Sequence, residues 1–393
     1  MNIRSYLRFL DRLVVKKKRM PIYTVLFVTA RCTCRCKHCL LGQGLIKDTR
    51  ELSLDQYEKI ARSMGPLLFL LPTGGEPFLR RDLPDIVSLF VKHTRVPNVG
   101  IPTNGTLTDQ VITSTERMLK EHPTLDLAVD VSLDGIGPLH DEIRGTRAFD
   151  KAVATFKELK KLAARFPRFN ANIGLTVSAY NEDHLRETYR YLRDTLGVKT
   201  INHLLVRGSP RDELAKEVNM EKYLDFSRFL DQEVRQGRLQ GYHGFPFANL
   251  VNSIRSVRPQ VIYDRVRREK PLVPCLAARL GAVILSNGLV YPCELLEKPL
   301  GDLNTNDFNF RKVWFSPQAR AVRRWIKENK CWCTYECFLT LSIFFSFRGL
   351  GRVLNHYISR YLLPAGIGKS DLQDGGVARK ETGHKPLNQP QDP

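Results

Sequence analysis

The stretch ARCTCRCKHC, residues 30–39, sets Cys32, Cys34, Cys36 and Cys39 directly behind the apolar run YTVLFVTA. A short apolar run rich in Val and Thr is typical of a buried β-strand. Closely spaced thiolates are ligands for soft metal ions and for iron–sulfur clusters. The sequence therefore predicts a metal-binding loop at the carboxyl end of a first strand.

Strand-like and helical patterns alternate along the chain from that first strand onward. The strand-like runs occupy residues 23–29, 67–71, 98–102, 127–133, 173–178 and 200–206. Helical patterns between them include residues 53–63, which open with a Ser53/Gln56 capping box, and residues 82–92, 149–165 and 182–195. Six β-then-α units predict an α/β fold, a partial (β/α)6 TIM-type barrel whose chemistry lies at the carboxyl ends of its strands.

The patterning divides the chain into segments. We expect a basic amphipathic helix over 1–20, a barrel core over 21–215, a helical linker over 216–270, a cysteine-rich unit over 271–345, a basic amphipathic segment over 346–368 and a disordered tail over 369–393. No uncharged apolar run of about eighteen residues occurs, so the sequence predicts no transmembrane helix. The odd count of nine cysteines and their metal-ligand spacing argue against disulfides and favour a reducing cytoplasm.

The net charge of +20 is unevenly distributed, with basic residues gathered near the N-terminus and over residues 311–330. Such clusters suit a phosphate group, an anionic metabolite or an anionic membrane surface, and also occur as solvated helix faces. Near the C-terminus Arg348, Arg352, His356 and Arg360 recur every fourth residue among apolar residues. Peripheral membrane contact, or packing on the barrel with the basic side in solvent, would each explain this pattern. Nucleic acid is not an expected partner, because basic and aromatic residues do not interleave.

The spacing Cys32-x3-Cys36-x2-Cys39 allows three thiolates to hold one face of an iron–sulfur cluster, which leaves Cys34 spare and one iron open. A structural zinc site, with Cys34 or His38 as fourth ligand, is the alternative. The stretch LLPTGGEPFL places Gly74, Gly75, Glu76 and Pro77 at the end of the second strand. Glycines there let the backbone approach a ligand, and Glu76 and nearby carbonyls can receive an ammonium group.

Together, the three-cysteine loop and the GGEP motif make the chain resemble the radical S-adenosylmethionine (radical SAM) superfamily. The resemblance continues through TNGTL with Asn104, VSLDG with Ser132 and Asp134, and HDEIRGT with Arg144. It implies that Cys32, Cys36 and Cys39 ligate a [4Fe–4S] cluster whose open iron chelates S-adenosylmethionine. It also implies that Gly74, Gly75, Glu76 and Pro77 receive the methionine end, that Asn104, Ser132 and Asp134 lie beside the cofactor, and that Arg144 pairs with its carboxylate.

A second cysteine unit contains Cys275 and Cys293, the latter in SNGLVYPC, followed by Cys331, Cys333 and Cys337 in KCWCTYEC. Its first half is similar to the SPASM or twitch extension of radical SAM enzymes, whereas its second half departs from the full pattern. Five thiols can complete one auxiliary [4Fe–4S] cluster. We expect Cys275, Cys293, Cys333 and Cys337 as its ligands, with Cys331 the doubtful fifth, and structural zinc is the alternative.

The resemblance implies an enzyme that cleaves S-adenosylmethionine reductively to a 5′-deoxyadenosyl radical, which abstracts a hydrogen atom from a substrate, with a flavodoxin or ferredoxin as electron donor. A peptide is the substrate class that the SPASM resemblance suggests. Only about twenty residues precede the first strand, too few for a fused leader-peptide-binding domain. A lipid-linked, sugar or phosphate-bearing metabolite is the second expectation. A binding protein that zinc or an iron–sulfur cluster stabilises, without catalytic activity, is the third.

Overall fold

The computed structural model describes residues 19–43, 50–241 and 248–361. Most of the basic N-terminal segment and the whole C-terminal tail from residue 362 lie outside these ranges, so the helix expected over 1–20 and the disorder expected over 369–393 stay predictions.

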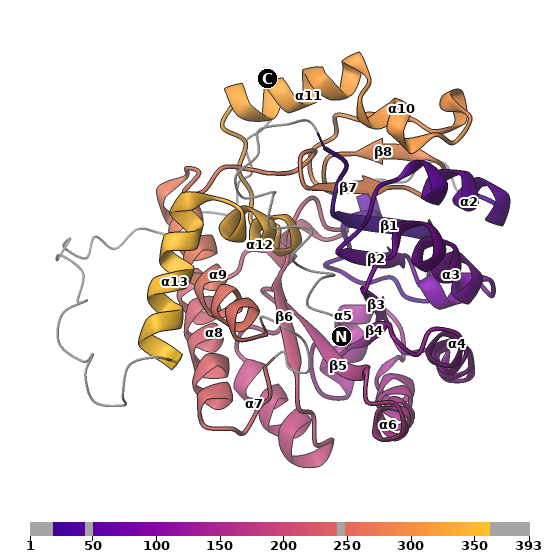
Figure 1. Ribbon diagram of the computed structural model, residues 1–393. Helices are drawn as coiled ribbons and strands as arrows, with labels where there is room; N and C mark the ends of the chain where they lie inside the picture. The colour runs from indigo at the N-terminus through magenta and orange to yellow at the C-terminus, as the bar shows by residue number, and fades with distance from the viewer. Residues whose placement is uncertain (1–18, 44–49, 242–247, 362–393) are drawn as a thin grey trace.

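The core of the molecule is a nine-stranded sheet in the order β6-β5-β4-β3-β2-β1-β7-β8-β9 (Figure 1). Its strands are β1 (Tyr23–Thr29), β2 (Phe69–Gly74), β3 (Asn98–Thr103), β4 (Asp126–Ser132), β5 (Phe169–Val177), β6 (Ile201–Leu205), β7 (Gly281–Ile284), β8 (Leu289–Tyr291) and β9 (Gly301–Asp302). Strands β1 to β6 pair in parallel and in chain order. This arrangement confirms the predicted α/β partial barrel.

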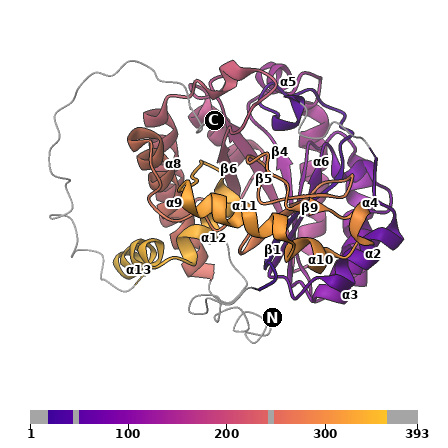
Figure 2. The same cartoon turned by 90° about the horizontal axis from the view of Figure 1, so that it is seen from above.

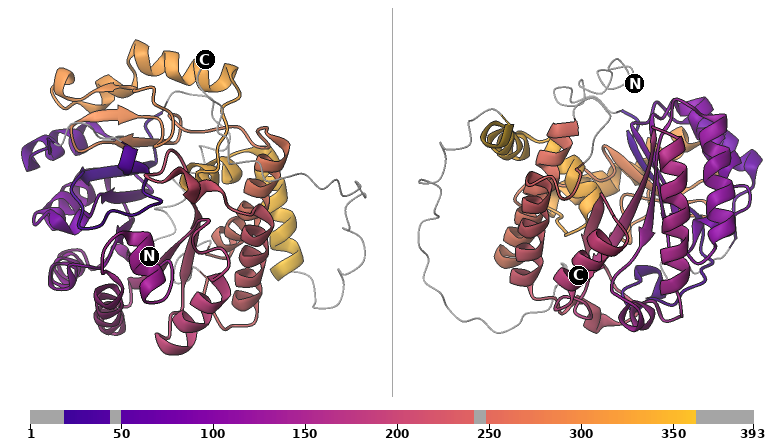
Figure 3. Two further views of the ribbon diagram at one scale, coloured as in Figure 1. Left: turned by 180° about the vertical axis from the view of Figure 1, so that it is seen from behind. Right: turned by 90° about the horizontal axis from the view of Figure 1, so that it is seen from below.

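Helices cover the outer face of the sheet and form a stack beside β6 (Figures 1 and 3). They are α2 (Leu54–Ser63), α3 (Leu83–Thr94), α4 (Thr108–Glu121), α5 (Pro138–Arg144), α6 (Phe149–Arg165), α7 (Leu185–Arg190), α8 (Met220–Arg235), α9 (Ala248–Arg268), α10 (Phe310–Trp314), α11 (Pro317–Glu328), α12 (Glu336–Phe344) and α13 (Phe347–Tyr361). The short turns η2 (Leu40–Gln43), η3 (Pro77–Leu79), η5 (Glu213–Lys216) and η6 (Asn304–Asn306) and a π-helical turn, η4 (Tyr191–Thr195), complete the set. The capping box predicted at Ser53 and Gln56 is present at the start of α2.

Alternation along β4 explains how the sheet separates two environments. Leu127, Val129 and Val131 are fully buried against the helices, as period-two patterning requires. Asp130 lies on the opposite face, where it accepts a hydrogen bond of 2.5 Å from the Asn202 side chain of β6. The inner face of the barrel is therefore polar between β4 and β6, which suits a face that receives a ligand.

The cysteine-rich unit continues the barrel sheet. Strand β7 pairs in parallel with β1, Tyr23 opposite Gly281, and β8 returns antiparallel through the turn at Asn287 and Gly288. Gly288 has a φ of +92°, which a glycine adopts at little cost. Asn287-Gly288 is a typical hairpin turn, whereas the union of this hairpin with the barrel sheet has no signal in the local sequence.

The stretch between the barrel and the cysteine-rich unit forms a long helix. Helix α9 runs from Ala248 to Arg268 with Pro259 inside it, although proline usually ends a helix. Buried Arg265 of α9 donates hydrogen bonds of 2.8 Å to the carbonyls of Cys333 and Val273. Helix α9 thus ties the cysteine-rich unit to the helical stack.

The described residues contain no single helix that is long and apolar enough to cross a membrane. Helices α12 and α13 taken together have the length and composition of a membrane span, but a bend of 86° separates them. Gly349 allows this bend, because a Cβ there would lie 2.2 Å from the Ile343 carbonyl oxygen.

Candidate active site

The four-cysteine loop follows β1 at the carboxyl ends of the parallel strands. Backbone hydrogen bonds from the loop after β6 hold its second half: Arg211 donates to the Cys39 carbonyl at 3.1 Å and Asp212 to the Lys37 carbonyl at 2.9 Å. The loop therefore lies at the end of the barrel where the patterning predicts chemistry.

The two glycines of GGEP lie against the backbone that leads into the cysteine loop. Gly75 donates to the Thr29 carbonyl at 2.9 Å, and Glu76 donates to the Arg31 carbonyl at 2.8 Å. A Cβ would come within 2.2 Å of the Thr29 oxygen at Gly74 and within 2.1 Å of the Arg31 oxygen at Gly75. The structure thus gives these glycines a role inside the chain, which is to let the end of β2 pack on the end of β1.

The Glu76 carboxylate is fully buried and occupied by the protein itself. It accepts hydrogen bonds from the Asn104 N–H at 2.7 Å, the Thr103 hydroxyl at 2.9 Å and the Phe78 N–H at 3.2 Å. Burial raises its pKa to about 7, and these hydrogen bonds oppose the rise. In this arrangement Glu76 joins the ends of β2 and β3, and Pro77 begins the buried turn η3 that follows.

The raised pKa of Glu76 predicts a pH-dependent stability. Between its ordinary value of 4.5 and about 7 the folded chain keeps a proton that the unfolded chain releases, so ionisation favours unfolding as the pH rises. We expect the unfolding free energy of the wild type to fall between pH 5 and pH 7 by about 2 kcal/mol more than that of Glu76→Gln. Urea titrations across this pH range would measure the difference, with the surface variant Glu297→Gln as control. Parallel curves for wild type and Glu76→Gln would contradict the assignment.

Asn104 fastens the beginning of the cysteine loop. Its side-chain amide donates to the Thr33 hydroxyl at 2.9 Å and contacts the Cys32 sulfur at 3.6 Å. The end of β3 therefore holds Cys32, the exposed cysteine of the loop.

The carboxyl end of α5 holds the middle of the loop. The carbonyls of Arg144 and Ile143 accept hydrogen bonds from Arg35 at 3.0 Å and Lys37 at 2.9 Å. Gly145 ends the helix with a φ of +64°, and a Cβ there would lie 2.7 Å from the Arg35 oxygen. A C-terminal glycine is a recognisable helix stop. That it docks on the cysteine loop depends on tertiary contacts.

Arg144 and Asp134 form a buried ion pair of 2.6 Å between α5 and the end of β4. A guanidinium nitrogen of Arg144 also contacts the Cys36 sulfur at 3.6 Å. Burial alone would raise the pKa of Asp134, but the charges of Arg144 and then His38 outweigh it, and the pKa lies below the ordinary value. Arg144 thus reaches both Asp134 and a predicted cluster ligand. Its pairing with a cofactor carboxylate stays a prediction.

The charge state of the loop thiols separates Cys34 from its neighbours. A hydrogen bond from Cys34 is the largest influence on both Cys32, whose pKa falls to about 6, and Cys36, whose pKa lies well below its ordinary value. The pKa of Cys34 is raised in turn by these hydrogen bonds to Cys32 and Cys36. Burial raises the pKa of Cys39. Cys34 thus donates to both Cys32 and Cys36, and the assignment of Cys32, Cys36 and Cys39 as ligands rests on their spacing.

The remaining residues around this site have simpler surroundings. Ser132 ends β4, half-buried, opposite Gly174 of β5. Lys37 pairs with Glu142 at 2.7 Å. His38 is buried 3.9 Å from Asp134, and its Nδ1 atom has no hydrogen-bond partner among the described residues.

The second group of cysteines lies between β7, β8 and α12. Cys275 shares a thiol hydrogen bond with Cys331. Burial, and then the charges of Cys333 and Cys275, raise the pKa of Cys293. Burial, and then the charge of Cys275, raise the pKa of Cys333. The Cys337 thiol contacts Tyr23 and lies near Arg207 and Glu294. Cys331, expected as the doubtful fifth thiol, is therefore in direct contact with a predicted ligand.

A polar junction that sequence reasoning missed connects the barrel mouth to this unit. Arg207, just after β6, donates to Glu294 at 2.9 Å and stacks over the Tyr335 ring at 4.5 Å. Glu336 of α12 accepts a hydrogen bond of 2.6 Å from the Leu205 N–H of β6. These residues are separated by many positions in the chain, so no local pattern could have revealed the junction.

The donor chemistry of both groups fits iron–sulfur clusters, because each stretch supplies at least three free thiols. Among the described residues, no group of three His, Cys, Asp or Glu side chains is arranged around one metal-ion position. The ligand assignments therefore rest on thiol chemistry and on the contacts of each loop.

A parallel barrel with a thiolate loop at its mouth and a cysteine-rich extension defines a class of iron–sulfur proteins that handle a bound small cofactor. Residues 26–192 match the model of the radical SAM superfamily, and residues 275–338 match that of the SPASM iron-sulfur cluster-binding domain. Residues 26–192 thus form a radical SAM domain, and residues 275–338 form a SPASM domain. The first domain implies S-adenosylmethionine and a [4Fe–4S] cluster, and the second implies auxiliary iron–sulfur clusters.

Among curated proteins, the chain is similar to pre-heme d1 synthase of Dinoroseobacter shibae, with 30% identity over 54% of this chain and 51% of the relative. It is also similar to Fe-coproporphyrin III synthase of Methanosarcina barkeri, with 34% identity over 35% of this chain and 33% of the relative. A GTP 3',8-cyclase of Limosilactobacillus fermentum shares 26% identity over 56% of this chain and 65% of the relative. The matched stretches thus span between about a third and two thirds of these relatives' lengths.

Among solved structures, Streptococcus suis SuiB bound to S-adenosylmethionine superposes with a TM-score of 0.57 and 15% identity, covering 82% of this chain and 71% of SuiB. Native anSMEcpe with bound AdoMet and Kp18Cys peptide gives a TM-score of 0.52 and 17% identity, covering 77% of this chain and 82% of that chain. At these identities the likeness concerns the fold.

Proposed function

We propose that this chain is an enzyme that cleaves S-adenosylmethionine reductively and abstracts a hydrogen atom from a substrate, with a peptide as the first substrate class to test. The observation that carries the proposal is the three-thiol loop, which contacts from the segments after β2 and β3, from α5 and from the loop after β6 hold at the barrel mouth. When bound, the reduced cluster would supply the electron that breaks the carbon–sulfur bond of S-adenosylmethionine. A flavodoxin or ferredoxin is the proposed electron donor.

In this proposal the protein's own residues position the reactants. Cys32, Cys36 and Cys39 would ligate the first cluster, while Asn104 and Arg144 orient the loop through Cys32 and Cys36. The backbone of residues 74–76 would lie beside the methionine end. Ser132 and Asp134, at the end of β4, are the proposed neighbours of the rest of the cofactor.

The peptide class rests on the SPASM domain and on the fold shared with SuiB, one structure of which holds the precursor peptide SuiA. A specific observation favours a second candidate, an anionic metabolite. The curated relatives are named for heme-type and GTP-derived products, and this chain has a net charge of +20. Stimulation of 5′-deoxyadenosine formation by candidate peptides or by anionic metabolites would separate the two classes.

Anaerobic reconstitution tests the enzyme proposal. We expect brown protein with about eight irons per chain and 5′-deoxyadenosine on addition of S-adenosylmethionine and dithionite. Colourless protein that holds zinc and forms no 5′-deoxyadenosine would favour a metal-stapled binding protein instead.

The auxiliary ligands make a separate prediction. Cys293→Ala should lower the iron content from about eight to about four per chain but leave dithionite-driven cleavage of S-adenosylmethionine in place, because Cys293 lies in the second thiol group. Iron analysis and 5′-deoxyadenosine assays on the same preparation would measure both. Loss of all iron, or an unchanged iron content, would refute the assignment of Cys293 to an auxiliary cluster.

A further inference from the structure

Helix α13 lies at the outer edge of the molecule, and two of its basic side chains reach the neighbouring helices. Arg360 forms an ion pair of 2.6 Å with Asp231 of α8 and donates to the Ser256 hydroxyl of α9 at 3.2 Å. Arg352 lies 3.6 Å from Asp264 of α9. The row of basic residues at every fourth position, expected to face solvent or a membrane, is therefore directed in part toward the carboxylates of the neighbouring helices.

The opposite side of α13 is apolar and exposed. Phe347 is 87% exposed, Leu354 44% and Ile358 45%, and their spacing of seven and four residues puts them on one helix face. Within the described ranges only one other large apolar side chain is exposed, Leu214 of η5. The views from the front and from above show no described element outside α13 (Figures 1 and 2). Contiguous exposed apolar side chains mark an interaction surface.

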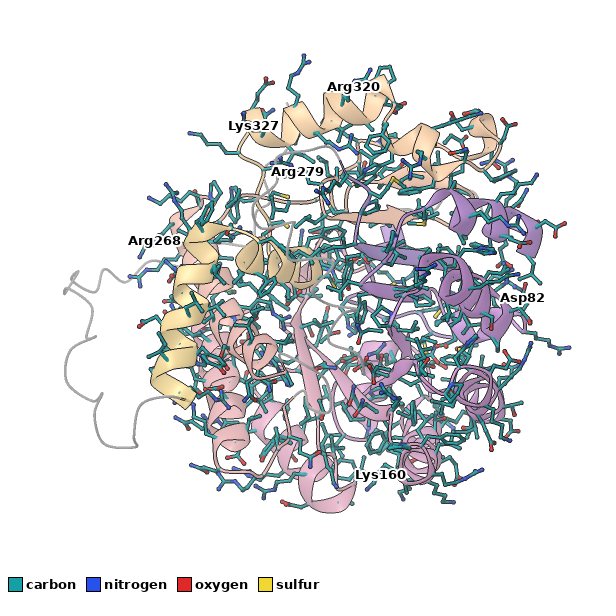
Figure 4. The ribbon with its side chains drawn as sticks, in the orientation of Figure 1. Asp82, Lys160, Arg268, Arg279, Arg320 and Lys327 are labelled. Carbon is teal, nitrogen blue, oxygen red and sulfur yellow. The ribbon has the colours of Figure 1, made fainter. Side chains whose placement is uncertain are left out.

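The surroundings of this stripe carry positive charge. Contacts of Arg352 with Asp264 and of Arg360 with Ser256 show that α13 runs antiparallel to α9, so the end of α9 lies beside the start of α13. Exposed Arg267, Arg268 and Arg348 gather there, and Figure 4 shows Arg268 on the same side of the molecule as α13. Residues 337–370 contain no Asp or Glu.

From these observations we infer that α13 docks on the surface of an anionic lipid bilayer. Phe347, Leu354 and Ile358 would enter the boundary between headgroups and acyl chains, while Arg267, Arg268 and Arg348 contact lipid phosphates. An apolar stripe flanked by arginines is the arrangement that interfacial helices use. The absence of acidic side chains from this segment favours an anionic lipid over a second copy of this basic chain.

Sedimentation with vesicles tests the inference on the full-length holoprotein. We expect binding to phosphatidylcholine vesicles with about 30 mol% phosphatidylserine, and little binding to phosphatidylcholine alone. The affinity of the triple variant Phe347→Ser/Leu354→Ser/Ile358→Ser for these vesicles should be lower than that of wild type by a factor on the order of ten or more. The control Leu214→Ser removes another exposed apolar side chain, far from α13 in the sequence, and should bind like wild type. Higher salt should weaken binding by wild type.

Three results would overturn the inference: no binding by wild type, equal binding by the triple variant, or equal binding to both vesicle types. A wild-type dimer that the triple variant converts to a monomer, without vesicle binding, would assign the stripe to a second copy instead. 5′-Deoxyadenosine formation by the triple variant reports separately on the enzyme and on its folding, because α13 lies outside the proposed active site.

Discussion

Cys36→Ala should reduce 5′-deoxyadenosine formation to the level of a blank without enzyme, the largest loss of activity that we expect. Cys36 is buried, its pKa is lowered by the hydrogen bond from Cys34, and it contacts Arg144. Removing one of three ligands leaves no site for the first cluster, so the iron content should also fall from about eight to about four per chain. Anaerobic assays with dithionite would measure both quantities.

Cys34→Ala is the matched control for Cys36→Ala. Cys34 is as buried as Cys36 and lies two residues away, but its raised pKa and its place inside the three-residue gap favour a protonated, spare thiol. We expect Cys34→Ala to keep its iron and most of its cleavage activity. Equal cleavage by wild type and Cys36→Ala, or equal loss in both variants, would refute the ligand assignment.

Arg144→Met should produce the largest loss of stability. It would leave the fully buried Asp134 carboxylate without its ion-pair partner. Arg144 lies 2.6 Å from this carboxylate, whereas His38 is farther away, at 3.9 Å, and cannot replace it. Losing one partner of a buried pair costs about 3–5 kcal/mol. Urea denaturation of the anaerobic protein would measure the free energy of unfolding.

Lys37→Met supplies the comparison for Arg144→Met, because Lys37 also links the cysteine loop to α5, through Glu142. That pair is largely exposed on the Glu142 side, so its loss should cost no more than about 1 kcal/mol. Similar losses for the two variants would mean that the Asp134 carboxyl is neutral or that water reaches it.

Much of the fold could be predicted because the signals are local. Strand β1 and helix α6 were predicted to the residue, since apolar runs and helical periodicity are properties of consecutive residues. The turn at Asn287 and Gly288 and the cap at Ser53 are also short-range. The long helix α9 was expected only as part of a helical linker, because Pro259 and the many arginines weaken its pattern.

The sequence by itself determined the thiol spacing, the GGEP motif and the order of strands, and with them the resemblance to radical SAM domains. Only the tertiary structure decided what these residues touch. Gly74 and Gly75 serve close packing on β1, Glu76 is enclosed by the ends of β2 and β3, and Arg144 reaches both Asp134 and Cys36. The sequence likewise did not determine whether the apolar side of α13 faces the protein or the solvent. This orientation depends on Asp231 and Asp264, carboxylates distant in the chain, and a helical pattern specifies two faces without specifying which one finds a partner.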